Sequence, residues 1–165
     1  MRDSIWAWVS VICLGFHGNM LAAQELPSVV VKNIAGQEIT WPQELPAQKT
    51  VVILAYKRAQ QEDVEGWIER LGFGSDGPYV QVLMLGRGAR LARGFIDGGL
   101  RSAFDAQQQQ RTFTVYVDAK VLNAPLQVAD TNSVSVFVID RKGRVLAREA
   151  GAPNAARVAK IKKAM

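Results

Sequence analysis

The stretch KTVVILAYKRAQQEDVEGW, residues 49–67, decides how this chain folds. Its apolar run, residues 51–55, is typical of a central strand that is covered on both faces. After a polar turn, apolar side chains recur at helical spacing, at Val64, Trp67, Ile68 and Leu71. The stretch therefore predicts a buried strand, a turn and an amphipathic helix, around which the other elements can be arranged.

Patterns of the same kind predict the other elements. Residues 79–85, YVQVLML, favour a strand parallel to the first, because a helix between two strands makes a β-α-β crossover. Residues 134–139 and 144–151, separated by a turn that closes on Gly143, predict an antiparallel hairpin. The remaining predicted elements are short strands at residues 29–33, 39–41 and 112–117 and a closing helix at residues 155–165.

The segment between residues 86 and 111 gives a weaker pattern. Leu91, Phe95, Leu100 and Phe104 are spaced as one face of a helix, although glycines within the segment disfavour helix formation. Residues 107–110 are four glutamines, which predict a surface loop.

Residues 1–23 differ in composition from the rest of the chain. A single Arg2 precedes an almost uncharged run, residues 5–16, and the small Ala23 suits the position before a cleavage site. This layout is typical of a secretory signal peptide, and the apolar run is shorter than the about 20 residues that cross a bilayer. We predict a signal peptide at residues 1–23 and a single periplasmic domain at residues 24–165. The alternative is an uncleaved N-terminal segment that anchors the protein in the membrane.

The only cysteine, Cys13, and the only histidine, His17, both fall within the predicted signal peptide. Disulfide exchange needs a thiolate, peroxide reduction by a peroxiredoxin needs an oxidisable cysteine, and zinc sites are built mainly from Cys and His. Residues 24–165 contain neither residue type. We therefore expect no thiol-based enzyme activity, no cofactor and no metal site.

The net charge of +5 favours anionic lipid surfaces or acidic partners. The basic residues are spread along the chain, and they lack the interleaved aromatic residues expected of a nucleic-acid-binding surface. Nucleic acid is therefore not expected as a partner.

The order strand, helix, strand, helix, followed by YVDAKVLNAPLQVADTNSVSVFVIDRKGRVLAREAG, resembles the thioredoxin-like superfamily, in its TlpA-like and peroxiredoxin-like branch. The resemblance covers residues 29–165, and its most specific part is FVIDRKGRV followed by Gly151. The strings WP, IDGGLR and QRTFTVYVD are also similar to bacterial relatives of the mitochondrial ATP-synthase assembly factor family. The resemblance implies an α/β thioredoxin-like sandwich, in which helices flank a mixed central sheet.

The family's redox residues do not carry over to this chain. Its two cysteines would fall near Gln60 and Asp63, and its cis-proline would fall near Val134. Because a cis bond before a residue other than proline costs about 3 kcal/mol, we expect a trans bond between Ser133 and Val134. The resemblance thus implies the fold and leaves out the disulfide chemistry.

Our first functional hypothesis is a non-catalytic binding, chaperone or assembly factor for a periplasmic or membrane protein. The resemblance places its contact residues at the edge where thioredoxins carry their cysteines. These candidates are Tyr56, Lys57, Arg58, Gln60 and Asp63 from the first turn and Asn132, Ser133 and Val134 from the facing loop. The alternative interpretation is that polar residues at a helix start cap the helix and face water.

Two further hypotheses involve charged side chains. Arg87, Arg90, Arg93 and Arg101 could bind an anionic small molecule or lipid headgroup, since a helix would place the first three on one side; the alternative is an exposed helix face. An enzyme that uses carboxylates would need two of its acidic residues together, and no motif in the sequence brings any two together. The acidic candidates are Glu62, Asp63, Asp97, Asp118 and Asp140.

Overall fold

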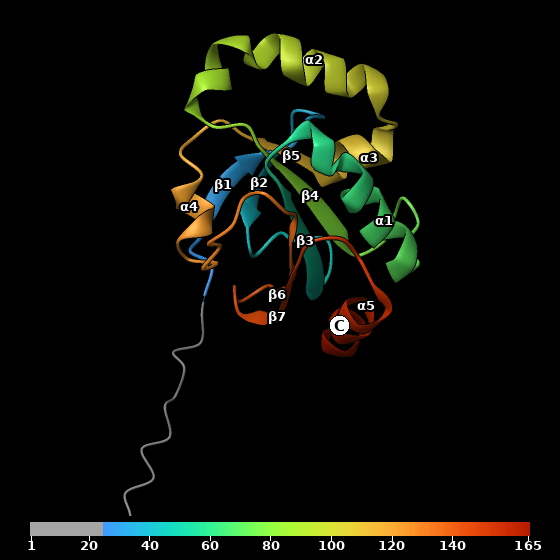
Figure 1. Ribbon diagram of the computed structural model, residues 1–165. Coiled ribbons are helices and arrows are strands. Elements are labelled where there is room, and N and C mark those ends of the chain that lie inside the picture. Colours follow the sequence, from blue (N-terminus) through green and yellow to red (C-terminus); the bar gives the residue numbers. More distant parts are fainter. Residues whose placement is uncertain (1–24) are drawn as a thin grey trace, which may run out of the picture.

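The computed structural model describes residues 25–165 (Figure 1). The predicted signal peptide, with Cys13 and His17, lies outside these residues. Within residues 25–165, no helix has the length and apolar character needed to cross a membrane.

The centre of the molecule is a five-stranded sheet in the order β5-β4-β3-β6-β7. Strand β3 runs parallel to β4, and β4 runs parallel to β5, whereas β6 is antiparallel to both β3 and β7. The sheet is therefore mixed, as expected, and the β-α-β crossover and the hairpin are both confirmed. The strands are β3 (Lys49–Ala55), β4 (Tyr79–Met84), β5 (Thr112–Val115), β6 (Ser135–Asp140) and β7 (Val145–Ala150).

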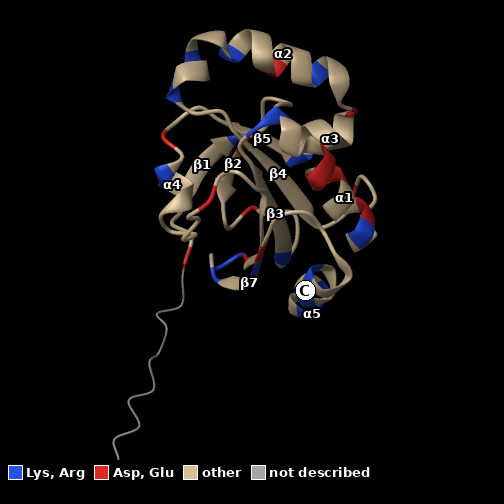
Figure 2. Ribbon diagram, viewed as in Figure 1, with Lys and Arg blue, Asp and Glu red and all other residues tan. Residues whose placement is uncertain are grey.

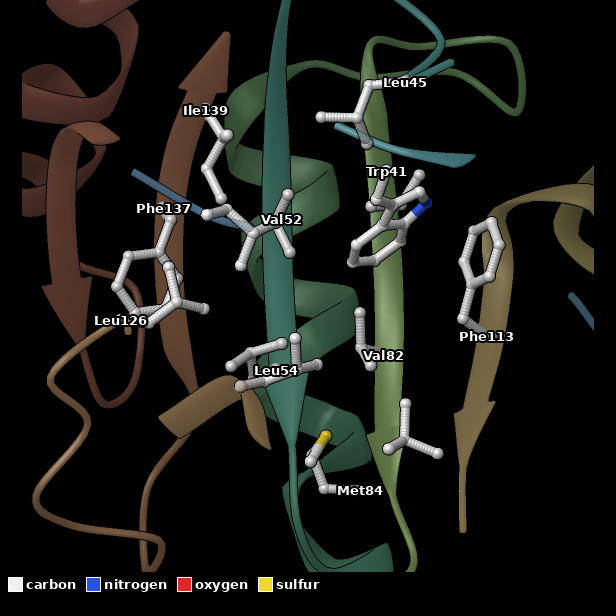
Figure 3. Packing of buried hydrophobic residues seen from close by; sticks show 14 residues of the cluster. Trp41, Leu45, Val52, Leu54, Val82, Met84, Phe113, Leu126, Phe137 and Ile139 are labelled. Atoms are coloured by element: carbon white, nitrogen blue, oxygen red, sulfur yellow. The ribbon is translucent and has the colours of Figure 1, made fainter. Parts of the chain in front are cut away.

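Alternate residues of β3 enter two separate apolar cores, one on each face of the sheet. Val52 and Leu54 pack with Trp41 and Phe113 in the first core, which Figure 3 shows from close by. Val51, Ile53 and Ala55 belong to the second core, together with Trp67. This division explains why residues 51–55 are apolar without interruption.

Helices cover the second core, and a small second sheet covers much of the first (Figure 1). Helices α1 (Gln61–Leu71) and α5 (Ala155–Ala164) lie on one side of the central sheet. On the other side lie the antiparallel strands β1 (Val29–Lys32) and β2 (Glu38–Trp41) and the short helix α4 (Lys120–Asn123). The result is the α/β sandwich predicted from the sequence.

Helix α1 is fixed to the sheet by its tryptophan. Trp67 is completely buried, and its indole Nε1 donates a hydrogen bond to the carbonyl oxygen of Gly151 at 2.9 Å. Gly151 follows β7 and precedes α5, so this bond ties α1 to the C-terminal part of the fold. The middle of α1 is thereby held in a fixed position relative to β7 and α5.

The segment between β4 and β5 differs from its prediction. In place of one helix, a 3₁₀ helix, η2 (Arg87–Ala92), is followed by α2 (Arg93–Ala103), and Leu91 and Phe95 are almost fully exposed. The apolar side chains stay exposed because α2 contacts the sheet through a polar residue, Asp97, which is its one buried side chain.

The prediction of a loop at residues 107–110 is also wrong, because these residues lie in helix α3 (Ala106–Arg111). Asp105 begins this helix: its side chain accepts hydrogen bonds from the backbone N–H groups of Gln107 and Gln108. The Gln108 side chain in turn accepts from the N–H of Asp105 at 3.0 Å. This reciprocal cap satisfies the free amides at the helix start. In the described chain the one cis peptide bond is Trp41–Pro42, so the bond between Ser133 and Val134 is trans, as expected.

Candidate functional site

A groove of about 620 Å³ lies at the carboxyl ends of β3 and β4, between α1 and α2. It contains the apolar side chains at the strand ends together with one side of α2, and its charged lining residues Lys57, Arg58 and Glu65 are exposed. The groove is lined by Ala55, Tyr56, Lys57, Arg58, Gln61, Glu65, Leu83, Leu85, Phe95, Ile96, Gly99, Leu100, Ala103 and Phe104.

The first wall of the groove is the turn between β3 and α1, which includes the 3₁₀ helix η1 (Arg58–Gln60). Tyr56 is half-buried there, and its hydroxyl donates a hydrogen bond to Asn123 Oδ1 at 2.7 Å. Burial raises the pKa of Tyr56 to about 12, although hydrogen bonds with Ser135 and Asn123 act in the opposite direction. Tyr56 is therefore neutral at any physiological pH. The hydrogen bond to Asn123 fixes the position of its ring in the wall.

Gln60 is the residue that holds this turn in shape. Its side chain is buried, and its Oε1 accepts hydrogen bonds from the backbone N–H groups of Tyr56 at 2.6 Å and Lys57 at 3.2 Å. Its Nε2 donates to the carbonyl oxygen of Thr131 at 3.1 Å, in the facing loop. One amide side chain thus joins the two segments that the thioredoxin-like resemblance places opposite each other.

The facing loop is joined to the turn by a second contact, at the surface. Lys57 Nζ donates to Asn132 Oδ1 at 2.6 Å. Asp130 accepts from the backbone N–H of Asn132 and from the hydroxyl of Ser133, each at 2.8 Å. These hydrogen bonds, with a smaller contribution from the charge of Lys57, hold the pKa of Asp130 below its ordinary value. The loop is therefore an ordered border beside the groove.

The structure divides the predicted partner-binding residues into three groups. Tyr56, Lys57 and Arg58 line the groove. Asp63, Asn132 and Ser133 lie beside it without lining it, and Asp63 is in the first turn of α1. The side chains of Gln60 and Val134 are buried, so they support the site from inside and do not present themselves to a partner.

The second wall of the groove, α2, is attached to the sheet through Asp97. Its Oδ1 accepts hydrogen bonds from the hydroxyl groups of Tyr116 at 2.7 Å and Thr114 at 3.0 Å. Arg93 pairs with Oδ2 of the same carboxylate at 3.4 Å and lies over the Tyr116 ring. At the other end of the helix, Arg101 Nε donates to the carbonyl oxygen of Ile34 at 2.5 Å. These polar contacts position the apolar residues of α2 along the groove.

The contact with Asp97 also changes the acidity of Tyr116. Burial, and after it the hydrogen bond and negative charge of Asp97, raise the pKa of Tyr116 to about 12, against a smaller opposing effect of Arg93. We expect Asp97→Asn to lower this pKa, because asparagine removes the negative charge beside the phenol. The pKa is measured by ultraviolet titration in a Tyr56→Phe, Tyr79→Phe background, in which Tyr116 is the one remaining tyrosine of the chain's three.

The exposed Asp76 supplies the matched control for this titration. We expect Asp76→Asn in the same background to leave the pKa of Tyr116 at about 12. An unchanged pKa in the Asp97→Asn protein would contradict the contact between α2 and the sheet.

The four predicted arginines do not form one anion site. Arg93 and Arg101 are engaged in the attachment of α2, with Asp97 and the Ile34 carbonyl. Arg87 and Arg90 lie on η2 and line a different hollow. The four side chains are therefore divided between two places, with Arg87 and Arg90 on η2 and Arg93 and Arg101 on α2. Anion binding by these arginines stays a prediction.

The candidate carboxylates likewise serve separate local structures. Asp97 holds α2, Asp118 Oδ1 accepts from the N–H of Lys120 at the start of α4, and Asp140 accepts from Lys142 and Arg144 in the hairpin turn. These three carboxylates share no hydrogen-bonding partner. Among residues 25–165, no group of three or more His, Cys, Asp or Glu side chains is arranged to hold a metal ion.

Comparison with known proteins identifies the fold. No protein-family model matches the chain, and no curated protein matches it. Among solved structures, the pneumococcal exposed lipoprotein thioredoxin Etrx1 of Streptococcus pneumoniae is similar, with a TM-score of 0.59 at 10% identity over 84% of this chain and 100% of its own. The thioredoxin domain of a thiol-disulfide oxidoreductase from Bacteroides vulgatus is similar with a TM-score of 0.55 at 10% identity, over 86% and 95% of the two chains.

A third similar structure is BsSco, a member of the Sco family of cytochrome c oxidase assembly proteins. Its TM-score is 0.53 at 10% identity, over 85% of this chain and 92% of its own. The thioredoxin-like fold is therefore confirmed. The narrower resemblance to the ATP-synthase assembly factor family stays a prediction.

Proposed function

We propose that this chain is a redox-inactive thioredoxin-fold protein that binds a polypeptide segment of a protein partner, as a non-catalytic binding, chaperone or assembly factor. The observation that carries the proposal is the groove at the carboxyl ends of β3 and β4. This is the end of an α/β sheet at which ligands bind. Because residues 24–165 contain no thiol and no imidazole, the groove is suited to holding a ligand rather than to redox chemistry.

The lining of the groove favours a polypeptide over a small polar molecule. Small-molecule sites place a few polar groups at convergent positions inside the pocket. In this groove the strand ends and α2 supply Leu83, Leu85 and Leu100, while the exposed charges belong to the turn and to α1. Phe95, 88% exposed, also lines the groove, and aromatic residues are enriched in protein interfaces. An extended or helical segment with apolar side chains fits this arrangement.

Two further points support the proposal. BsSco shows that a protein of this fold can belong to a family of assembly proteins. The signal-peptide pattern of residues 1–23 supports a location of the proposed activity in the periplasm, with a membrane-anchored form of the same domain as the alternative.

The proposal is tested by photocrosslinking from the groove in living cells. A photoreactive residue replaces Gln61, which lines the groove and is half-exposed; position 60 is unsuitable because its side chain is buried. We expect a discrete crosslinked partner, and we expect Leu100→Glu in the same protein to reduce its yield by about tenfold or more, because a charge would replace an apolar contact.

Leu146→Glu is the matched control, because Leu146 is a partly exposed leucine on β7 outside the groove. This variant should retain the crosslink. Equal crosslinking in the Leu100→Glu and Leu146→Glu proteins, with both folded by circular dichroism, would exclude the groove as the binding site.

A further inference from the structure

A second surface, separate from the groove, combines exposed aliphatic and basic side chains. Arg87, Arg90 and Leu91 from η2 and Val117 and Val121 from the chain after β5 line one hollow, which we call the η2–α4 patch. Leu91 is 101% exposed, and Val117 and Val121 are 45% and 49% exposed. Few large aliphatic residues in residues 25–165 are exposed to this degree, and three of them share one surface.

The charge of the η2–α4 patch is positive. Arg87 and Arg90 are exposed and, within the described part of the chain, neither forms an ion pair. Lys120, next to Val121 in α4, is exposed as well. The one acidic residue in the lining is Asp118. Figure 2 shows the basic positions along η2 and in α4 on the same side of the molecule.

We propose that the η2–α4 patch docks on an anionic lipid bilayer. Leu91, Val117 and Val121 enter the boundary between headgroups and acyl chains, and the neighbouring basic side chains contact lipid phosphates. Burial of apolar side chains at the headgroup boundary and attraction of Arg and Lys to anionic lipids are the two contributions to interfacial membrane binding. The η2–α4 patch supplies side chains for both. This inference does not depend on the proposed function of the groove.

Two alternative occupants fit the patch less well. A second copy of the chain would bring the same positive charges face to face, which disfavours association. Protein interfaces are enriched in aromatic residues and methionine at their centre, whereas the exposed apolar residues of this patch are one leucine and two valines. An anionic bilayer supplies both the negative charge that the basic side chains require and an apolar region that accepts the aliphatic side chains.

The test is co-sedimentation of the full chain with vesicles of phosphatidylglycerol mixed with phosphatidylcholine, or of phosphatidylcholine alone. Every variant keeps the same N-terminus, so residues 1–24 contribute equally. We expect at least about tenfold stronger binding to the anionic vesicles, weakening as salt is raised. Replacing sodium chloride by inorganic phosphate at equal ionic strength should cause no further loss, because a free phosphate cannot accept the aliphatic side chains.

Two double variants separate the two components of the contact. We expect Arg87→Glu with Arg90→Glu to reduce anionic-vesicle binding by about tenfold or more, and Leu91→Ser with Val121→Ser to reduce it by about tenfold. The control is Lys162→Glu with Lys163→Glu on α5, which makes the same charge change at exposed positions elsewhere. The control should bind within about threefold of the unaltered chain.

Three outcomes would overturn the proposal. The first is equal loss in the control and the arginine variant, which would show a general charge effect. The second is unchanged binding in the Leu91 and Val121 variant. The third is a dimer in sedimentation that this same variant abolishes, which would assign the patch to self-association. Because the groove crosslink is measured separately, its failure would leave this result standing.

Discussion

Replacing Trp67 by alanine is expected to lower the free energy of unfolding by about 3–5 kcal/mol, because the substitution empties a fully enclosed site in the second core. It also leaves the Gly151 carbonyl without the indole donor that it has in the folded protein. For a domain of this size the melting temperature should fall by roughly 10–20 °C. The measurement is urea denaturation followed by circular dichroism.

Trp67→Phe separates the two contributions. Phenylalanine keeps most of the apolar volume and removes the N–H donor, so we expect a loss of about 1–3 kcal/mol. Arg70→Ala, an exposed change in the same helix, should stay within about 0.5 kcal/mol of the unaltered protein. If Trp67→Phe is as stable as the unaltered protein, the hydrogen bond to Gly151 contributes nothing and the packing of the ring alone fixes α1.

Gln60→Ala is expected to lower the free energy of unfolding by about 2–4 kcal/mol. The change removes a buried side chain that accepts from the N–H groups of Tyr56 and Lys57 and donates to the Thr131 carbonyl. A buried polar group left without a partner costs about 1–3 kcal/mol, and the partly exposed turn recovers some of this from water. Because Tyr56 and Lys57 also line the groove, crosslinking from position 61 should fall in the same variant.

Gln61→Ala is the matched control for the stability measurement, one residue further along. Its side chain donates to Glu65 at the surface, so its loss should change the stability by less than about 0.5 kcal/mol. Equal stability of the Gln60→Ala and Gln61→Ala proteins would contradict the role of Gln60 in joining the turn to the facing loop.

The sequence predicts well the elements whose apolar side chains are all buried against a core. Residues 51–55 are apolar without a break because β3 contributes to cores on both faces. Trp67 and its apolar neighbours repeat at helical spacing because α1 packs one face on the sheet. In these elements the local pattern and the tertiary structure require the same residue types, so the pattern is sufficient to predict the element.

The candidate site is harder to predict from the sequence, because the residues that hold it in shape are polar and buried. Gln60 lies in a polar stretch that is typical of a surface turn. Only its hydrogen bonds in the folded protein reveal that its side chain is buried. Asp97 interrupts the apolar spacing of its segment, and it is nevertheless the residue that α2 buries. The spacing of Leu100 and Phe104 predicts one side of a helix, but the sequence carries no signal that this side borders a groove.

The attachment of α2 by polar contacts divides the molecule into two parts of unequal stability. The sheet, α1 and α5 are held by extensive apolar burial, whereas α2 depends on the contacts of Asp97, Arg93 and Arg101. Elements with little buried apolar surface open at a lower free energy than the core. The backbone amides of α2 should therefore exchange their hydrogens by a local opening, well before those of β3. The width of the groove can then adjust to ligands of different size by movement of α2 alone, while the rest of the fold stays intact.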